Sequence, residues 1–149
     1  MCGIAGVIAR DKNRVSRAQL DAARSKLEHR GPDGSGTWVN SRGTVGLVHT
    51  RLAIVDLAGG QQPIANEQEN VQVVFNGEIY NHIELRADLE AQGHRFRTRC
   101  DAEVLVHLYE EFGLEMFSHL NGMFAFALWD ETKKTLILAR DRLGQKPLY

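Results

Sequence analysis

The sequence predicts an α+β domain in which helices cover largely antiparallel sheets. Strand-like runs come first, one helical segment interrupts them, further strands follow, and two helical segments precede a final pair of strands. This order is neither a regular alternation of strands and helices nor an all-β pattern, so it favours the α+β class. The length of 149 residues suits a single domain spanning residues 1–149.

The first third of the chain contains one predicted helix between strand-like runs. Residues 2–9, CGIAGVIA, form a continuous apolar run that is typical of a strand covered on both faces. Residues 16–31 predict a helix that begins after an N-cap at Ser16 and ends at Gly31. Residues 31–57 then alternate short strand-like pieces with glycine turns.

The middle of the chain predicts a strand, a helix and a second short strand. Residues 71–77, VQVVFNG, form an apolar, β-branched run that ends in Asn-Gly. Residues 81–93 predict a helix that opens with a capping box between Asn81 and Glu84. Residues 95–98, RFRT, predict a short strand.

The last third predicts a helix and a hairpin. Residues 101–113 show helical spacing of apolar side chains, and residues 123–141 form two apolar runs around the turn ETKK. Within the helix, Glu103 and His107 lie one turn apart. One carboxylate and one imidazole fall short of a complete metal site, so we expect a solvated helix face and no metal.

Charge and composition exclude several classes of partner. The net charge of -1 gives no basic surface for nucleic acid or an acidic membrane. No apolar run approaches the length that spans a bilayer. Two cysteines do not form a disulfide framework in a chain of this size, so we expect a cytoplasmic protein.

Two cysteines are candidate nucleophiles, since the sequence lacks the G-x-S-x-G pattern of a nucleophilic serine. Arg97 and Arg99 precede Cys100 and could lower its pKa, but a packed thiol in an alternating segment is the favoured interpretation. Cys2 differs because removal of Met1 would give it a free α-amino group. The reference pKa of such a group, about 7.7 to 8.0, suits a general base. Its local sequence alone favours a buried strand cysteine.

Seven motifs occur together and in order. MCGIAG, HRGPDGSG, HTRLAIVD, FNGEIYNH, CDAEV, NGMFAFALWD and RDRLGQKPLY resemble the glutamine-hydrolysing domain of class II (N-terminal nucleophile) amidotransferases, and most closely that of glutamine-hydrolysing asparagine synthetases. The resemblance covers the chain from Cys2 to Tyr149. It implies an N-terminal nucleophile hydrolase fold, a sandwich of two sheets between helices in αββα order.

The resemblance implies catalytic roles for three residues. Cys2, freed of Met1, would attack the side-chain amide of glutamine and form a thioester. The side chain of Asn76 and the backbone N–H of Gly77 would stabilise the oxyanion. The residues themselves leave an alternative open, because Asn-Gly is also the commonest signal for a two-residue hairpin turn.

The resemblance also implies a set of substrate contacts, each with a structural alternative. Arg51 would bind the α-carboxylate of glutamine, although a lone arginine between strands is usually a surface residue. Glu78 and Asp101 would bind the α-ammonium group, while Asp101 could simply cap a helix. Backbone groups of Ile54 and Val55 would contact the substrate, whereas both residues otherwise suit a core strand.

The same resemblance implies partners outside this chain. It implies a C-terminal synthetase domain that uses ATP and magnesium to activate aspartate and receives ammonia, whereas the glutaminase domain itself needs no cofactor. The chain is then the N-terminal part of a longer protein, with the sandwich truncated at its C-terminal end. A glutaminase serving another acceptor and a non-catalytic glutamine-binding or regulatory domain remain alternatives, and a homodimer is left open.

Overall fold

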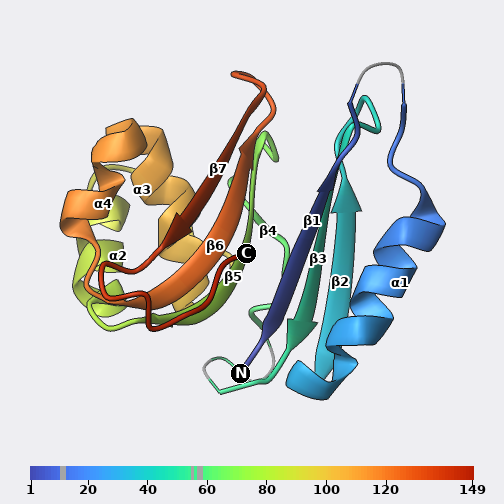
Figure 1. Cartoon of the computed structure of the whole chain (residues 1–149). Helices are drawn as coiled ribbons and strands as arrows, with labels where there is room; N and C mark the ends of the chain where they lie inside the picture. Colours follow the sequence, from blue (N-terminus) through green and yellow to red (C-terminus); the bar gives the residue numbers. More distant parts are fainter. Residues whose placement is uncertain (11–12, 55, 57–58) are drawn as a thin grey trace.

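The computed structural model describes residues 1–10, 13–54, 56 and 59–149. Its elements form four layers: a helix, a sheet, a second sheet and a group of helices (Figure 1). All pairings between neighbouring strands of the two sheets are antiparallel. The predicted α+β class and the αββα order are therefore confirmed.

The first sheet contains three strands in the order β1-β3-β2. These strands are β1 (Gly3–Ile8), β2 (Gly34–Val39) and β3 (Val45–Arg51). The helix α1 (Arg17–Leu27) covers the outer face of this sheet (Figure 1). Its buried Leu20 packs where Gly46 leaves room, since a Cβ on that glycine would lie 2.7 Å from the leucine side chain.

The second sheet contains four strands in the order β4-β5-β6-β7, with the remaining helices on its far side (Figure 1). The strands are β4 (Ile64–Ala65), β5 (Val71–Ile79), β6 (Gly122–Asp130) and β7 (Thr135–Arg140). The helices are α2 (His82–Ala91), α3 (Val104–Phe112) and α4 (Met116–His119), with the 3-10 turns η2 (Asp101–Glu103) and η3 (Gly113–Glu115). A further 3-10 turn, η1 (Glu28–Arg30), follows α1 and contacts β3 of the first sheet. No helix in the described part of the chain is long and apolar enough to cross a membrane.

Strand β5 lies between two apolar layers. Val73 and Phe75 pack against the helices, whereas Val74 packs with Leu47 in the layer between the sheets. Successive side chains of a strand point to opposite faces, so Asn76 shares the face of Val74 and points toward the first sheet. The alternation of the strand thus directs a polar side chain between the two sheets.

The two predicted helix starts have different outcomes. Ser16 forms a capping box, because its hydroxyl accepts a hydrogen bond from the Gln19 N–H and the Gln19 side chain accepts one from the Ser16 N–H. The capping box predicted at Asn81 is wrong. The Asn81 side chain instead donates to the His119 carbonyl and accepts from the Asn121 N–H, so it ties the start of α2 to the end of α4.

The short strand predicted at residues 95–98 is also wrong; this segment, which lies within the described residues, forms no strand. Its backbone N–H groups at Arg97 and Thr98 donate to the Glu103 carboxylate at 2.7 and 2.8 Å. The predicted solvated face at Glu103 and His107 is also wrong, because both side chains are buried. The buried Glu103 carboxylate accepts the hydrogen bonds that hold residues 95–98 in place.

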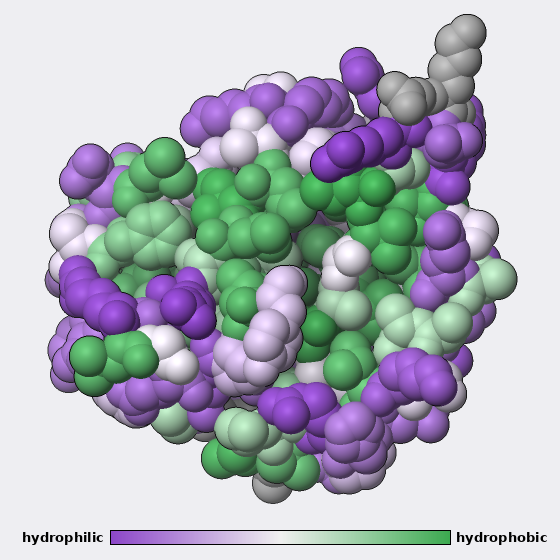
Figure 2. Space-filling model, in the orientation of Figure 1, coloured by the Kyte–Doolittle hydropathy of each residue, from purple (hydrophilic) through white to green (hydrophobic). Residues whose placement is uncertain are grey.

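Strand β1 is less covered than its apolar sequence predicts, because it is an edge strand. Only Gly3 of this strand is buried, and Ile8 is 56% exposed. Residues of β1, β7 and the C-terminal segment line an apolar groove, and Figure 2 shows apolar side chains gathered on the corresponding face. The side of β1 that faces the second sheet therefore borders this groove.

Candidate active site

A small cavity lies where the two sheets meet at the N-terminal end of β1. It receives residues from the first sheet, from β5 of the second sheet and from the turn that precedes α3. Its lining consists of Met1, Cys2, Arg51, Leu52, Ile54, Gly60, Gln62, Phe75, Asn76, Gly77, Glu78, Cys100, Asp101, Met123 and Lys146. Every described residue among the predicted site residues is in this set.

Cys2 is held at the entrance to β1 by contacts with the first sheet. Its sulfur accepts a hydrogen bond from the Leu52 N–H at 3.4 Å, and its carbonyl accepts one from the Arg30 side chain at 3.1 Å. The next residue must be glycine, since a Cβ on Gly3 would lie 2.6 Å from the Thr50 hydroxyl oxygen. The half-buried thiol is therefore fixed in place beside the cavity.

Arg51 is the last residue of β3, and its side chain is buried, not on the surface. Its guanidinium donates to the Asp56 carbonyl, which orients the group at the cavity wall. Gly60 lies close to it with φ of +66°, and a Cβ there would be 3.1 Å from the Arg51 Nη2. The surface alternative for this arginine is wrong.

Asn76 and Gly77 lie within β5, so the alternative of a hairpin turn is wrong. The strand continues to Ile79, and these two residues pair with Ala125 and Phe124 of β6. The Asn76 side chain is buried at the cavity. The strand thus presents an amide group and a backbone toward the cavity that Cys2 borders.

Gly77 has a structural reason to be glycine that the sequence interpretation missed. A Cβ at this position would lie 2.1 Å from the Met123 carbonyl oxygen and 2.7 Å from the Phe124 Cα. The clash is with backbone atoms of β6, which cannot move without breaking the pairing of the two strands. The glycine is therefore needed for packing as well as for access to a substrate.

We expect Gly77→Ala to lower the free energy of unfolding by about 3 kcal/mol, because overpacking against backbone is not relieved by side-chain rotation. Gly6→Ala is the matched control on another strand, since a Cβ on Gly6 would make only ordinary contacts at 3.6 Å. Urea unfolding of both variants and the wild type measures the difference. Equal stabilities for the two variants would contradict the explanation.

Two carboxylates face the same cavity from the second sheet and the turn before α3. Asp101 is buried, and its Oδ2 accepts a hydrogen bond from the Ile79 N–H at 2.8 Å. It therefore connects η2 to β5, and the helix-capping alternative is wrong. Burial and the neighbouring charge of Asp101 raise the pKa of Glu78 above its ordinary value. The two acids form a negatively charged wall.

Cys100 is a packed thiol, as the favoured interpretation predicts. It is buried, and its sulfhydryl group donates to the Asp101 Oδ1 at 3.4 Å. Burial and the charge of Asp101 raise the pKa of Cys100 to about 12. The flanking arginines do not activate it, so of the two thiols in the cavity only Cys2 remains a candidate nucleophile.

The remaining residues at the cavity include one of the two predicted backbone contacts and two residues that were not predicted. Ile54 lines the cavity on a loop and is 69% exposed, so it is not a core strand residue. Val55 lies outside the described residues. Gln62 and Lys146 line the cavity and were not predicted; Gln62 accepts a hydrogen bond from the Phe75 N–H at 2.7 Å. Their positions depend on long-range folding that no local pattern reveals.

Met1 forms part of the cavity wall. The Lys146 ammonium group lies 3.2 Å from the Met1 sulfur. With Met1 present, the cavity has a volume of about 90 Å³, below the roughly 300 Å³ at the lower end for small-molecule pockets. Loss of Met1 would enlarge this space next to the thiol.

Comparison with known proteins finds relatives that match the full chain. A model of the glutamine amidotransferase domain matches residues 1–149. Asparagine synthetase 2 (glutamine-hydrolysing) of Oryza sativa subsp. japonica is 47% identical over 150 residues, which are 100% of this chain and 25% of the relative. Asparagine synthetase 3 (glutamine-hydrolysing) of Bacillus subtilis is 44% identical over 152 residues, which are 100% of this chain and 24% of the relative. The chain thus spans about a quarter of the length of these curated relatives.

A solved structure shows the same fold in a more distant protein. The glutamine phosphoribosylpyrophosphate amidotransferase of B. subtilis superposes with a TM-score of 0.54 at 24% identity, over 93% of this chain and 31% of that chain. At this identity the match bears on the fold alone, and it agrees with the αββα sandwich. The resemblance inferred from the seven motifs is confirmed by these comparisons.

Proposed function

The chain belongs to the glutamine amidotransferase domain family, and from this premise we propose that its cavity hydrolyses the side-chain amide of glutamine to glutamate and ammonia. The observation that carries the proposal is the meeting of Cys2, Arg51, Asn76 and Asp101 in one cavity from four segments that are distant in the sequence. A domain that only retained the fold would not need this complete set.

The charges of the cavity match the backbone groups of an amino acid. The Arg51 guanidinium suits the α-carboxylate, because its planar donors match two carboxylate oxygens. Asp101 and Glu78 suit the α-ammonium group, and the Cys100 and Ile79 contacts fix the Asp101 carboxylate. Glutamine held at these points extends its side-chain amide toward Cys2.

The chemistry follows from the groups at the other end of the cavity. The α-amino group of Cys2 takes the thiol proton, and the thiolate attacks the amide carbon. The carbonyl oxygen becomes an oxyanion that accepts hydrogen bonds from the Asn76 side chain and the Gly77 N–H. The α-ammonium group then gives its proton to the amide nitrogen, the C–N bond breaks, and ammonia leaves a γ-glutamyl thioester on Cys2. Water, deprotonated by the α-amino group of Cys2, then hydrolyses the thioester to glutamate and the free thiol.

We also propose that a C-terminal domain of the full-length protein uses the ammonia. The support is that relatives identical at 44–47% are glutamine-hydrolysing asparagine synthetases about four times as long as this chain. ATP and magnesium would belong to that domain, which activates aspartate for amide formation. The glutaminase chemistry proposed for the cavity uses side chains, the Gly77 N–H and the Cys2 amine.

The proposal requires a free α-amino group on Cys2, so removal of the preceding residue should switch activity on. A protease-cleavable segment fused directly before Cys2, in place of Met1, gives a protein that serves as its own control. We expect no glutamate release before cleavage and turnover afterwards, with intact mass confirming Cys2 as the first residue. Equal activity before and after cleavage would contradict the role of the α-amine.

A further inference from the structure

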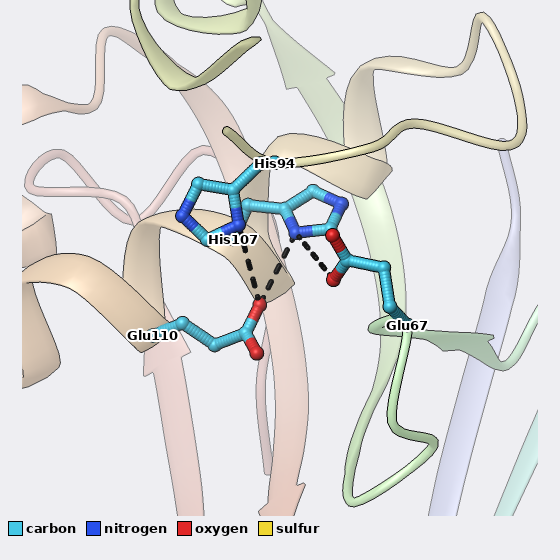
Figure 3. A group of neighbouring side chains, drawn as sticks. All are labelled: Glu67, His94, His107 and Glu110. Carbon is cyan, nitrogen blue, oxygen red and sulfur yellow. Dashed lines mark hydrogen bonds and ion pairs between the residues drawn. The ribbon is translucent and has the colours of Figure 1, made fainter. Parts of the chain in front are cut away.

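A second group of chemically active side chains lies on the helical side of the second sheet, outside the lining of the glutamine cavity. Glu67 comes from the loop between β4 and β5, His94 from the segment after α2, and His107 and Glu110 from α3. Figure 3 shows the two carboxylates approaching the two imidazoles from different sides. One ligand atom from each residue lies within 4.8 Å of all the others.

The closest spacings within the group fit a small tetrahedral ion. The Glu110 Oε2 lies 3.2 Å from the His107 Nδ1 and 3.7 Å from the His94 Nδ1, and the Glu67 Oε2 lies 3.5 Å from the His107 Nδ1. Zinc bonds of 2.0–2.1 Å in tetrahedral geometry place neighbouring ligand atoms about 3.3 Å apart. These three spacings therefore need shifts of only a few tenths of an ångström.

The second atom of each carboxylate is held from outside the group. The Glu67 Oε1 accepts from the Arg95 N–H at 2.9 Å, and the Glu110 Oε1 accepts from the Asn66 side-chain amide at 2.6 Å. One oxygen of each carboxylate is therefore anchored, and the other points into the group.

The His94 imidazole has a carboxylate behind it, since its Nε2 lies 2.8 Å from the Glu111 carboxylate. A carboxylate behind a histidine places the proton on the far nitrogen and leaves the near nitrogen free to bind metal. The Nδ1 of His94 is thus oriented as a ligand. The buried His107 Nε2 lies 4.0 Å from the Glu103 carboxylate, beyond hydrogen-bond distance, and has no hydrogen-bond partner among the described residues.

The group has an electrostatic preference for a cation. Each imidazole lies within 4.0 Å of more than one carboxylate: His94 lies near Glu110 and Glu111, and His107 lies near Glu67, Glu103 and Glu110. A divalent ion bound between the imidazoles would neutralise the carboxylates of Glu67 and Glu110.

We propose that Glu67, His94, His107 and Glu110 form a structural binding site for a divalent ion of the zinc class. Two imidazoles and two carboxylates are ligands that zinc accepts, and four protein ligands complete its tetrahedral coordination. The ion would join the β4–β5 loop, the segment after α2 and helix α3. Such a site stabilises the fold and takes no part in glutamine chemistry.

Zinc titration of chelator-treated protein tests the site. The thiols of the glutamine cavity also bind zinc, so the titration uses the chain with Cys2→Ser and Cys100→Ser, against a competing zinc indicator. We expect one equivalent of zinc to bind and the Tm to rise by on the order of 5 °C at saturating zinc. Cobalt(II) in place of zinc should give the intense visible absorption of a tetrahedral complex.

Ligand variants locate the ion. In the same background, His94→Gln and Glu110→Gln should each weaken zinc binding by about 100-fold or more, because each removes one ligand atom while keeping a polar side chain of similar size. His29→Gln, an exposed histidine in η1, is the matched control and should bind zinc like the parent. Circular dichroism confirms that each variant is folded.

Three outcomes would overturn the site. Folded, thiol-free protein that binds no zinc would show that the four side chains are held only by their contacts with one another. Equal zinc binding in the ligand variants and the His29→Gln control would show an adventitious ion. An octahedral cobalt spectrum would show that the four side chains do not coordinate together.

Discussion

Cys2→Ala should lower glutamate release from glutamine by a factor on the order of 10³ or more, since loss of a catalytic nucleophile removes the covalent route. The Cys2 side chain lies at the cavity beside the Leu52 N–H, and alanine keeps the backbone of β1 unchanged. Glutamate formation measured with purified protein starting at residue 2 checks this result. Incubation with glutamine should also give a γ-glutamyl adduct by intact mass in the wild type and no adduct in Cys2→Ala.

The control for this experiment is the other thiol of the same cavity. Cys100→Ser replaces the sulfhydryl group that donates to Asp101 with a hydroxyl group that can donate in the same way. We expect this variant to keep turnover and to form the adduct. Activity in Cys2→Ala would contradict the proposed mechanism. Loss of activity in Cys100→Ser alone would show that Cys100, and not Cys2, is the nucleophile.

Asn76→Ala should reduce kcat by about 10²- to 10³-fold, which is the typical loss when one oxyanion donor is removed. The KM for glutamine should change much less, because the amide of Asn76 binds the oxyanion, which develops only after attack. Steady-state kinetics separate the two effects. An unchanged kcat with a raised KM would instead make Asn76 a substrate-binding residue.

The matched control is Gln72→Ala, on the same strand. Gln72 is also a buried amide side chain of β5, but it lies outside the cavity lining and donates to the Glu69 carbonyl. Both variants lose a buried amide and should lose similar stability in thermal unfolding. Only Asn76→Ala should lose kcat, so a loss shared by both would indicate a structural effect.

Much of the fold could be predicted because its signals are local. The Ser16 N-cap, the helical spacing in residues 104–112 and the two apolar runs around ETKK each depend on a few neighbouring residues. The αββα order required the resemblance, since periodicity does not indicate which faces of two sheets pack together. Cys2 and Arg51 were likewise placed by motif, and the structure brings them to one cavity.

The errors arose where a distant partner decided the local structure. Asn81 has the sequence of a capping box, yet its side chain binds His119 and Asn121 across a helix pair. Residues 95–98 have strand-like sequence, but the buried Glu103 carboxylate takes their backbone N–H groups. The pair Glu103 and His107 looked solvated because the sequence does not show the loop and segment that cover it.

The division of the cavity between two sheets has a consequence for how the layers hold together. Under the proposed roles, glutamine has its carboxylate on Arg51 of the first sheet and its amide oxygen on Asn76 of the second. A bound substrate then contacts both sheets, one at each end. Side chains such as Leu47 and Val74 set the distance between the sheets. This distance therefore selects substrates by the length of their side chain. Asparagine, one methylene shorter than glutamine, would not reach both anchors.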